Sequence, residues 1–168
     1  MGLYDRYVLP RVINLACSSS PNMKQREKVI PRAEGEVLEI GMGSGLNLPF
    51  YDRAKVRKVW GLEPSEGMRQ LARRNMGGAN LDLEMIDLPG EEIPLDENSV
   101  DTVVVTYTLC TIPDADKALR GMARVLRPGG KLLFCEHGIA PAERIATWQN
   151  RLDPVWGVFA GGCHINRH

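Results

Sequence analysis

The stretch VLEIGMGSG, residues 37–45, closes an apolar run with an acid, Glu39, and three glycines at alternate positions. Gly41, Gly43 and Gly45 permit a sharp turn and a close approach of the backbone to a ligand, because they carry no Cβ and adopt positive φ at little cost. Backbone amides in such a loop can face a carboxylate or a phosphate. The pattern therefore favours a ligand-binding loop over a tight turn that binds nothing.

The glycine spacing bears on the kind of ligand. A dinucleotide fingerprint reads G-x-G-x-x-G, and here the third glycine comes one residue earlier, which disfavours a pyrophosphate. Glu63 follows the next apolar run, about 20 residues past the loop, where a carboxylate can accept hydrogen bonds from ribose hydroxyls. This acid fits NAD and other adenosine ligands alike. An acid that starts a helix at Pro64, where negative charge is favourable, is the alternative interpretation of Glu63.

Asp87 and Leu88 follow the third apolar run. The carboxylate of Asp87 can accept a hydrogen bond from an adenine amino group, while the amide of Leu88 can meet a ring nitrogen. Taken alone, Asp87 is more typical of a turn. In register with Glu39 and Glu63 it becomes a candidate ligand.

Polar and aromatic residues close the fourth apolar run and follow the fifth. Thr106, Tyr107 and Thr108 in TYTLCTI can contact the ligand or a second substrate, or simply pack. His137, directly after the fifth run, is the candidate general base, and a hydrogen-bonded structural histidine is the alternative. We take His137 and Tyr107 as the candidate catalytic residues.

The C-terminal sequence GGCHINRH invites comparison with a metal site or a nucleophile. Cys163 and His164, with His168, are too few ligands without further partners, so no metal is expected.

These residues need a scaffold, and the chain supplies a regular one. Apolar stretches at residues 37–40, 59–62, 81–86, 103–106 and 132–135 alternate with helix-like windows at 65–75 and 115–126. Alternation of this kind predicts a parallel sheet with crossover helices, which is a doubly wound α/β domain whose ligands bind at the carboxyl ends of the strands. We divide the single domain, residues 1–168, into a helical cap (1–34), a core (35–136) and a C-terminal segment (137–168).

The cap predicts two helices. The first has an apolar face interrupted by Pro10, and we expect that face to pack on the domain body, with a lid or a membrane-surface contact as alternatives. The second starts at Ser20-Pro21 and runs to about residue 30. The apolar face of the first helix consists of Leu3, Tyr4, Tyr7, Val8, Val12, Leu15 and Ala16.

Composition excludes several classes of protein. The 168 residues are 43% hydrophobic and 25% charged, and 21 basic residues balance 21 acidic ones, so no net field attracts nucleic acid. The four cysteines lie far apart with no CxxC, which favours reduced thiols in a cytoplasmic protein. No apolar run approaches the roughly 18 residues of a membrane span.

Taken together, the motifs resemble the class I S-adenosylmethionine-dependent methyltransferases, over residues 36–136. VLEIGMGSG is similar to that family's first motif, GLEPSEGM to its ribose acid, MIDLPGEEIPLDENSVD to its adenine-contact segment, and LRPGGKLLFCEH to its turn into the fifth strand. GLNLPFY and WQNRLDPVWGVFAGGCHINR resemble a small bacterial subgroup, similar to mammalian proteins implicated in alkyl-thiol methylation and more distantly to ubiquinone/menaquinone C-methyltransferases.

The resemblance implies a cofactor, S-adenosyl-L-methionine, with S-adenosyl-L-homocysteine as product. Gly41, Gly43 and Gly45 would line its methionine moiety, Glu63 would hold the ribose and Asp87 would approach the adenine. The remaining residues of the predicted cofactor site are Glu39, Asn47, Pro64, Leu88 and Thr106. The mammalian relatives begin with a membrane anchor, whereas this chain shows none, so we do not expect lipid association.

We expect methyl transfer to a small, largely apolar acceptor, with a thiol or a quinol- or phenol-type carbon or oxygen as the leading candidates. A nicotinamide-dependent oxidoreductase and a partner protein that binds the cofactor without turnover remain the alternatives. The sulfonium donor is already activated, so positioning of the two substrates carries most of the catalysis. A base is needed only where the acceptor arrives protonated.

The resembled family ends with two further strands, whereas no strand-like run follows Cys135 here. We therefore expect five strands in the order 3-2-1-4-5, with residues 131–137 at an edge or covered only by residues 148–159. An apolar edge invites pairing, so we expect a homo-oligomer through it. On this hypothesis the acceptor-side segment, 137–168, is truncated or is completed by a partner.

Overall fold

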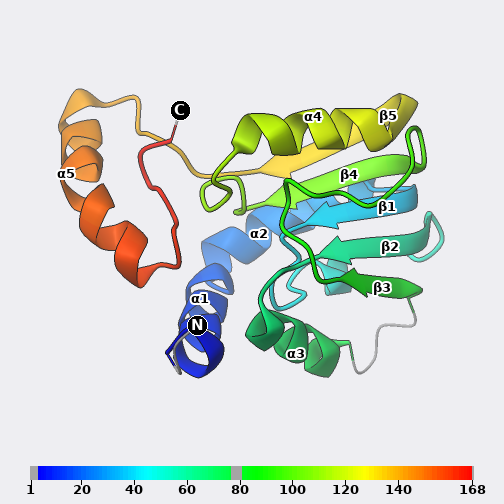
Figure 1. Ribbon diagram of the computed structural model, residues 1–168, viewed down its shortest axis with the longest axis horizontal. Coiled ribbons are helices and arrows are strands. Elements are labelled where there is room, and N and C mark those ends of the chain that lie inside the picture. Colours follow the sequence, from blue (N-terminus) through cyan, green and yellow to red (C-terminus); the bar gives the residue numbers. More distant parts are fainter. Residues whose placement is uncertain (1–3, 77–80, 168) are drawn as a thin grey trace.

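A computed structural model describes residues 4–76 and 81–167 and contains one parallel sheet. Its strand order, β3-β2-β1-β4-β5, confirms the predicted order 3-2-1-4-5 of a doubly wound, Rossmann-like α/β domain. All five strands point toward the side where α1 and α5 lie (Figure 1). The strands are β1 (Gly35–Ile40), β2 (Val56–Leu62), β3 (Leu83–Ile86), β4 (Val100–Thr106) and β5 (Leu126–Cys135).

Local capping explains where two of the crossover helices begin. The side chain of Ser65 accepts a hydrogen bond from the amide of Met68, and Asp114 does the same for Lys117. The helical elements in chain order are η1 (Tyr4–Val8), α1 (Leu9–Cys17), α2 (Ser20–Val29), η2 (Ile30–Arg32), η3 (Leu48–Phe50), α3 (Glu66–Asn75), α4 (Ala115–Val125) and α5 (Glu143–Phe159). No helix among the described residues is long and apolar enough to cross a membrane.

Both faces of β1, at the centre of the sheet, are buried, as is typical of a parallel sheet. In β1, Leu38 and Ile40 join the core on the α4 side, whereas Val37 joins the core on the opposite side with Ile30. Successive side chains of a strand point to opposite faces, so a short apolar run supplies both cores.

β5 is longer than the predicted run at 132–135. Val100 pairs with Leu126 and Thr102 with Lys131, so residues 127–130 form an irregularity within the strand. Beyond it the strand forms one edge of the sheet, and Phe134 is 64% exposed. The predicted edge position is therefore confirmed.

The first helix differs from the expectation. Tyr7, Val12 and Leu15 are exposed, and Leu15 is 75% exposed, so the prediction that this apolar face packs on the domain body is wrong for these residues. The helix meets the body through other residues: Pro10 is buried, and Pro10 and Ile13 line the cavity described below. Leu3 lies outside the described residues.

Candidate active site

A cavity of about 320 Å³ opens at the carboxyl ends of the strands. Its wall includes seven residues that the sequence analysis singled out, together with residues of α1 and of the segment after β3. These seven are Gly41, Gly43, Glu63, Pro64, Thr106, Tyr107 and Thr108. The other candidates, Glu39, Gly45, Asn47, Asp87, Leu88 and His137, do not line it.

The three glycines share a left-handed backbone but serve different purposes. Their φ angles are +63° at Gly41, +59° at Gly43 and +78° at Gly45. A Cβ on Gly41 would overlap the side chain of Thr108, and one on Gly45 would lie 2.7 Å from Leu48 Cδ1. A Cβ on Gly43 would meet only the carbonyl oxygen of Gly41, at 3.9 Å. Gly41 and Gly45 thus permit packing, while Gly43 leaves open space at the cavity.

Glu63 lies in the wall and is hydrogen-bonded to the loop. Its Oε2 accepts from the amide of Gly43 at 2.9 Å, and its Oε1 accepts from the amide of Ser65 at 2.8 Å. Burial raises the pKa of this carboxyl, and the two amide hydrogen bonds oppose that effect. The Glu63 carboxylate, a hydrogen-bond acceptor, is therefore held beside the open space at Gly43.

A buried polar network supports the loop from behind. Glu39 accepts hydrogen bonds from Asn47 Nδ2 at 2.9 Å and from the Tyr51 hydroxyl at 2.7 Å. Arg26 Nη1 donates to Asn47 Oδ1 at 2.8 Å and to Thr106 Oγ1 at 2.7 Å. Glu39 and Asn47 therefore position the wall rather than form it.

Sequence reasoning missed Arg26. Its side chain lines the cavity at 5% exposure, and its guanidinium carbon lies 5.1 Å from the centre of the Tyr107 ring. Its Nε is buried and has no hydrogen-bond partner. Lys24 and Lys28 flank it on α2, and that helix shows no apolar periodicity, so nothing in the sequence distinguished Arg26 from its neighbours.

Asp87 is held at the rim by an arginine. Both its carboxylate oxygens accept hydrogen bonds from Arg69, with Nη2 2.8 Å from Oδ2. Arg69 also donates to the carbonyl oxygen of Glu63 at 2.6 Å, which joins the ends of β2 and β3. The cavity wall nearest this rim is formed by Pro89 and Gly90 instead of Leu88.

Tyr107 and His137 meet at the opposite side of the cavity. Tyr107 follows β4 with φ of +55°, a strained angle for a residue other than glycine. Its ring stacks against that of His137, with the centroids 6.5 Å apart and the planes at 19°. Tyr107 thus stands between His137 and the cavity, and burial raises the pKa of its hydroxyl.

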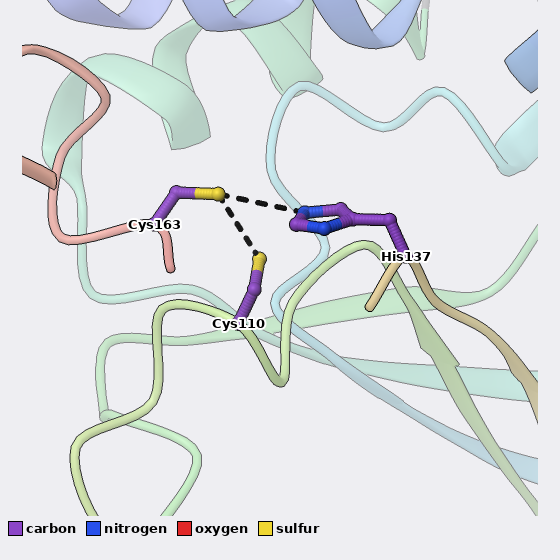
Figure 2. Close-up of side chains that lie close together, drawn as sticks. All are labelled: Cys110, His137 and Cys163. Carbon is purple, nitrogen blue, oxygen red and sulfur yellow. Dashed lines mark hydrogen bonds between the residues drawn. The ribbon is translucent and has the colours of Figure 1, made fainter. Parts of the chain in front are cut away.

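The structure brings two cysteines to His137 that lie far from it in the sequence (Figure 2). Cys163 Sγ lies 3.5 Å from His137 Nε2 and 3.5 Å from Cys110 Sγ. The hydrogen bond with Cys110, and then the one with His137, lowers the pKa of Cys163, and the pKa of His137 is raised in turn. His164 turns away, with Nδ1 2.8 Å from Asp153 Oδ2.

Comparison with known proteins matches the sequence of this chain to one family. A family model described as a methyltransferase domain matches residues 38–134. Thiol S-methyltransferase TMT1B of Rattus norvegicus is 35% identical over 138 residues, covering 80% of this chain and 56% of that protein. Demethylmenaquinone methyltransferase of Clavibacter sepedonicus is 29% identical over 117 residues, covering 70% of this chain and 47% of that protein. The chain thus spans about half the length of these relatives.

Solved structures show the same fold. The YcgJ protein from Bacillus subtilis superposes with a TM-score of 0.67 at 23% identity, covering 86% of this chain and 60% of that one. A SAM-dependent methyltransferase from Aquifex aeolicus gives 0.63 at 22% identity, covering 80% and 76%. Because the family model also matches more than half of the sequence, the chain belongs to the class I S-adenosylmethionine-dependent methyltransferases.

Proposed function

We propose that the protein transfers the methyl group of S-adenosylmethionine to a small, largely apolar acceptor. The observation that carries the proposal is the Gly43–Glu63 arrangement, in which open space and a hydrogen-bonded carboxylate share one wall. A volume of about 320 Å³ falls within the range of small-molecule sites. The wall therefore fits a ligand that offers hydroxyl donors to Glu63.

Different residues of the site would bind different parts of the cofactor. Glu63 would accept hydrogen bonds from the ribose hydroxyls, and the Gly43 backbone would run beside the ligand. Arg26, with its buried and unpartnered Nε, would face the carboxylate of the methionine moiety, because a buried cation requires a compensating anion or acceptors. Asp87, fixed by Arg69, would stand at the adenine end together with the amide of Leu88.

When bound, the cofactor supplies a methyl group on a positively charged sulfur, so the protein has little covalent chemistry to perform. The chain's own contribution is to hold the acceptor against that group and to exclude water, an effect worth up to about 7 to 11 kcal/mol. Leu9, Ile13, Met68 and Ile112 line the same cavity and give the acceptor an apolar surface. These side chains favour a small apolar acceptor over a charged one.

A thiol is the acceptor that we favour, with a quinol or phenol as the second candidate. The relatives named thiol S-methyltransferases and demethylmenaquinone methyltransferase support these two classes respectively. Either acceptor must lose a proton. Tyr107 would orient the acceptor from the wall, and His137, one ring behind it, would be the proton-accepting group predicted from the sequence.

Calorimetric titration with S-adenosylhomocysteine tests the cofactor site. We expect the native protein to bind, and Gly43→Ala to weaken binding by more than about tenfold, equivalent to about 1.4 kcal/mol, because the new Cβ occupies the open side of the wall. Gly129→Ala is the matched control, since Gly129 has φ of +80° and a Cβ added there would have no atom within 4 Å. Both variants carry the same kind of backbone strain, and only the first alters the cavity.

Turnover is tested with isotope-labelled S-adenosylmethionine and a panel of alkyl thiols, phenols and quinols. Transfer to a thiol supports the favoured acceptor, and transfer to a quinol alone supports the second. Cofactor binding without transfer to any of the panel would support a non-catalytic partner protein. Absence of binding by the native protein, with binding of NADH in a fluorescence titration, would replace the proposal with the oxidoreductase alternative.

A further inference from the structure

Three soft-metal ligands converge beside the cavity from three separate segments. Cys110 follows β4, His137 follows β5, and Cys163 lies after α5 (Figure 2). Their ligand atoms all lie within 4.8 Å of one another. We propose that Cys110, His137 and Cys163 form a zinc site whose fourth position is open to the sulfur of a thiol acceptor.

The spacing of the ligand atoms matches tetrahedral zinc. With Zn–S of about 2.3 Å and Zn–N of about 2.0 Å, neighbouring ligand atoms are about 3.5 to 3.8 Å apart. The separations from Cys163 Sγ to Cys110 Sγ and to His137 Nε2 are both 3.5 Å. The remaining pair, Cys110 and His137, lies within 4.8 Å, so a small side-chain adjustment completes the geometry.

Hydrogen bonds fix the three segments relative to one another. Glu136 Oε1 accepts from the amides of Thr108 and Leu109, which ties the loop carrying Cys110 to the end of β5. The amide of His164 donates to the carbonyl oxygen of Cys110 at 3.0 Å. Arg167 Nη1 donates to the carbonyl oxygen of Leu109 at 2.6 Å. The ligands are therefore held by their backbones before any ion binds.

The protonation and the exposure of the three side chains favour binding of a metal ion, which replaces the protons of its ligands. Cys163 Sγ lies within hydrogen-bond distance of both Cys110 Sγ and His137 Nε2, and the thiolate is the form of cysteine that binds metals. Cys110 is buried, while Cys163 and His137 are partly exposed, so an ion has a route of entry. Metal binding releases protons from such ligands, and its free energy adds to the stability of the fold.

The open position depends on the proposed function. Zinc sites with three protein ligands characteristically keep a fourth position for water or substrate. Tyr107, stacked on His137, and Gly161, two residues before Cys163, both line the cavity, so the cluster borders the acceptor space. In this arrangement His137 is a zinc ligand instead of the proton-accepting group. A thiol that takes the open position gives up its proton to solvent and stays bound as a thiolate, because a coordinated thiol is deprotonated.

Metal content tests the site without any activity assay. The tag-free protein is equilibrated with zinc chloride and a thiol-free reductant, desalted, and analysed by mass spectrometry of its metals. We expect about one zinc per chain, and less than about a fifth of that in Cys163→Ser and His137→Ala, because two protein ligands hold zinc far more weakly than three. Thermal melts establish that both variants are folded.

Two neighbours of the ligands serve as matched controls. His164→Ala removes the adjacent histidine, whose Nδ1 faces Asp153, and Cys135→Ser removes a thiol that faces the Tyr107 hydroxyl at 3.4 Å. Both should retain zinc. Native protein without zinc, or ligand variants with as much zinc as the controls, would overturn the site.

Cobalt substitution tests the open position. Co²⁺ added to the metal-free protein should produce thiolate-to-cobalt charge-transfer absorption that Cys163→Ser loses, and ethanethiol should then change the spectrum. A spectrum unchanged by ethanethiol would overturn the open position. Binding of S-adenosylhomocysteine by metal-free protein separates the two proposals: zinc without cofactor binding contradicts the proposed function, and cofactor binding without zinc contradicts the metal site.

Discussion

The two sides of the cavity are built by different means. On the β1 side, Arg26, Glu39, Asn47 and Thr106 are at most 5% exposed and are hydrogen-bonded to one another behind the glycine loop. On the β5 side, the segment at 138–167 is hydrogen-bonded to the loop after β4 through Arg167, the His164 amide and Cys163, and α5 leaves large apolar side chains in solvent. Figure 1 shows α5 set apart from the sheet.

This difference separates a preformed side from an adaptable one. A buried polar network holds its members in one arrangement, because each lost partner leaves an unsatisfied group away from water. A segment with few buried apolar contacts opens locally at lower free energy than the core. We therefore expect the β1 side to unfold only with the whole domain and the β5 side to open independently.

The largest effect is expected from Arg26→Met. The change keeps much of the side-chain volume but deprives Asn47 Oδ1 of its buried donor and leaves Glu39 without its nearby positive charge. The free energy of unfolding should fall by about 3 kcal/mol, as when one partner of a buried charged network is removed. Urea denaturation measures this loss.

Lys28→Met is the matched control, because Lys28 lies on the same helix and is exposed. It should change the free energy of unfolding by less than about 0.5 kcal/mol. Equal losses in the two variants would show that the network contributes nothing beyond helix α2 itself, and the contrast between the two sides of the cavity would fail.

Gln149→Ala tests the other side of the cavity. Gln149 Oε1 accepts from the amide of Ala140 at 2.7 Å, and its Nε2 donates to the carbonyl oxygens of Gly138 and Ile165. Loss of these bonds should lower the local opening free energy by about 1 to 2 kcal/mol. Amide hydrogen exchange near residues 138–140 and 163–167 should accelerate, while exchange in β1 should not.

The exchange pattern decides whether the sides are independent. Gln70→Ala is the control, since Gln70 makes an exposed hydrogen bond to Glu66 on α3 and does not reach the C-terminal segment. Acceleration of exchange throughout β1 in Gln149→Ala would mean that the two sides unfold as one unit.

The sequence predicted the positions of those residues that end a strand or directly follow one. The glycine loop and Glu63 directly follow strands that the apolar runs predicted, and Thr106 is the last residue of another, so a parallel sheet brings them to one edge. The strand order followed from the same alternation and the resemblance. Gly41 and Gly45 show what the sequence could not predict, because only the three-dimensional structure distinguishes a glycine required by packing from one that faces the cavity.

The rest depended on contacts between distant residues. Cys110, His137 and Cys163 share no short motif, and the expectation of no metal considered only the ligands adjacent in the sequence, Cys163 and His164, with His168. His168 lies outside the described residues. Arg26 was invisible because a polar helix gives no sign of which basic residue turns inward. Tertiary contacts, rather than local pattern, select these residues.

A smaller effect is expected on the β1 side, in the pH dependence of the free energy of unfolding. Burial raises the pKa of Glu39 above its ordinary value of 4.5. The folded protein therefore retains this proton to higher pH than the unfolded chain, so the free energy of unfolding falls as pH rises from about 4.5 through the raised pKa. Glu39→Gln should flatten that decline, because a neutral amide can still bond to Asn47 and Tyr51.

Urea denaturation over a series of pH values measures the slope. The decline should be reduced in Glu39→Gln and not abolished, because burial also raises the pKa of Glu63 and of Glu136. Glu92→Gln, at an exposed position, should leave the slope unchanged. An unchanged slope in Glu39→Gln would show that water reaches the network and that the β1 side is not closed.

The smallest effect on folding and the most direct test of the β5 side come from Phe134→Lys. Leu132 and Phe134 pair in register with Val103 and Val105, which lie in the α4-side core, but both are exposed because they stand at the edge. We predict that the native chain associates through this edge and that a lysine there prevents it, since charged residues block strand pairing. The free energy of unfolding should change by less than about 0.5 kcal/mol.

Light scattering over a concentration series separates the edge from the rest of the surface. Leu119→Lys is the matched control, because Leu119 is an exposed leucine on α4 and takes no part in the β5 ladder, so it should leave association unchanged. Association that persists in Phe134→Lys would show that the chains meet through another apolar surface. The first candidate is α5, because Trp148, Leu152 and Phe159 are exposed there. A native chain that stays monomeric at every concentration would contradict the edge prediction.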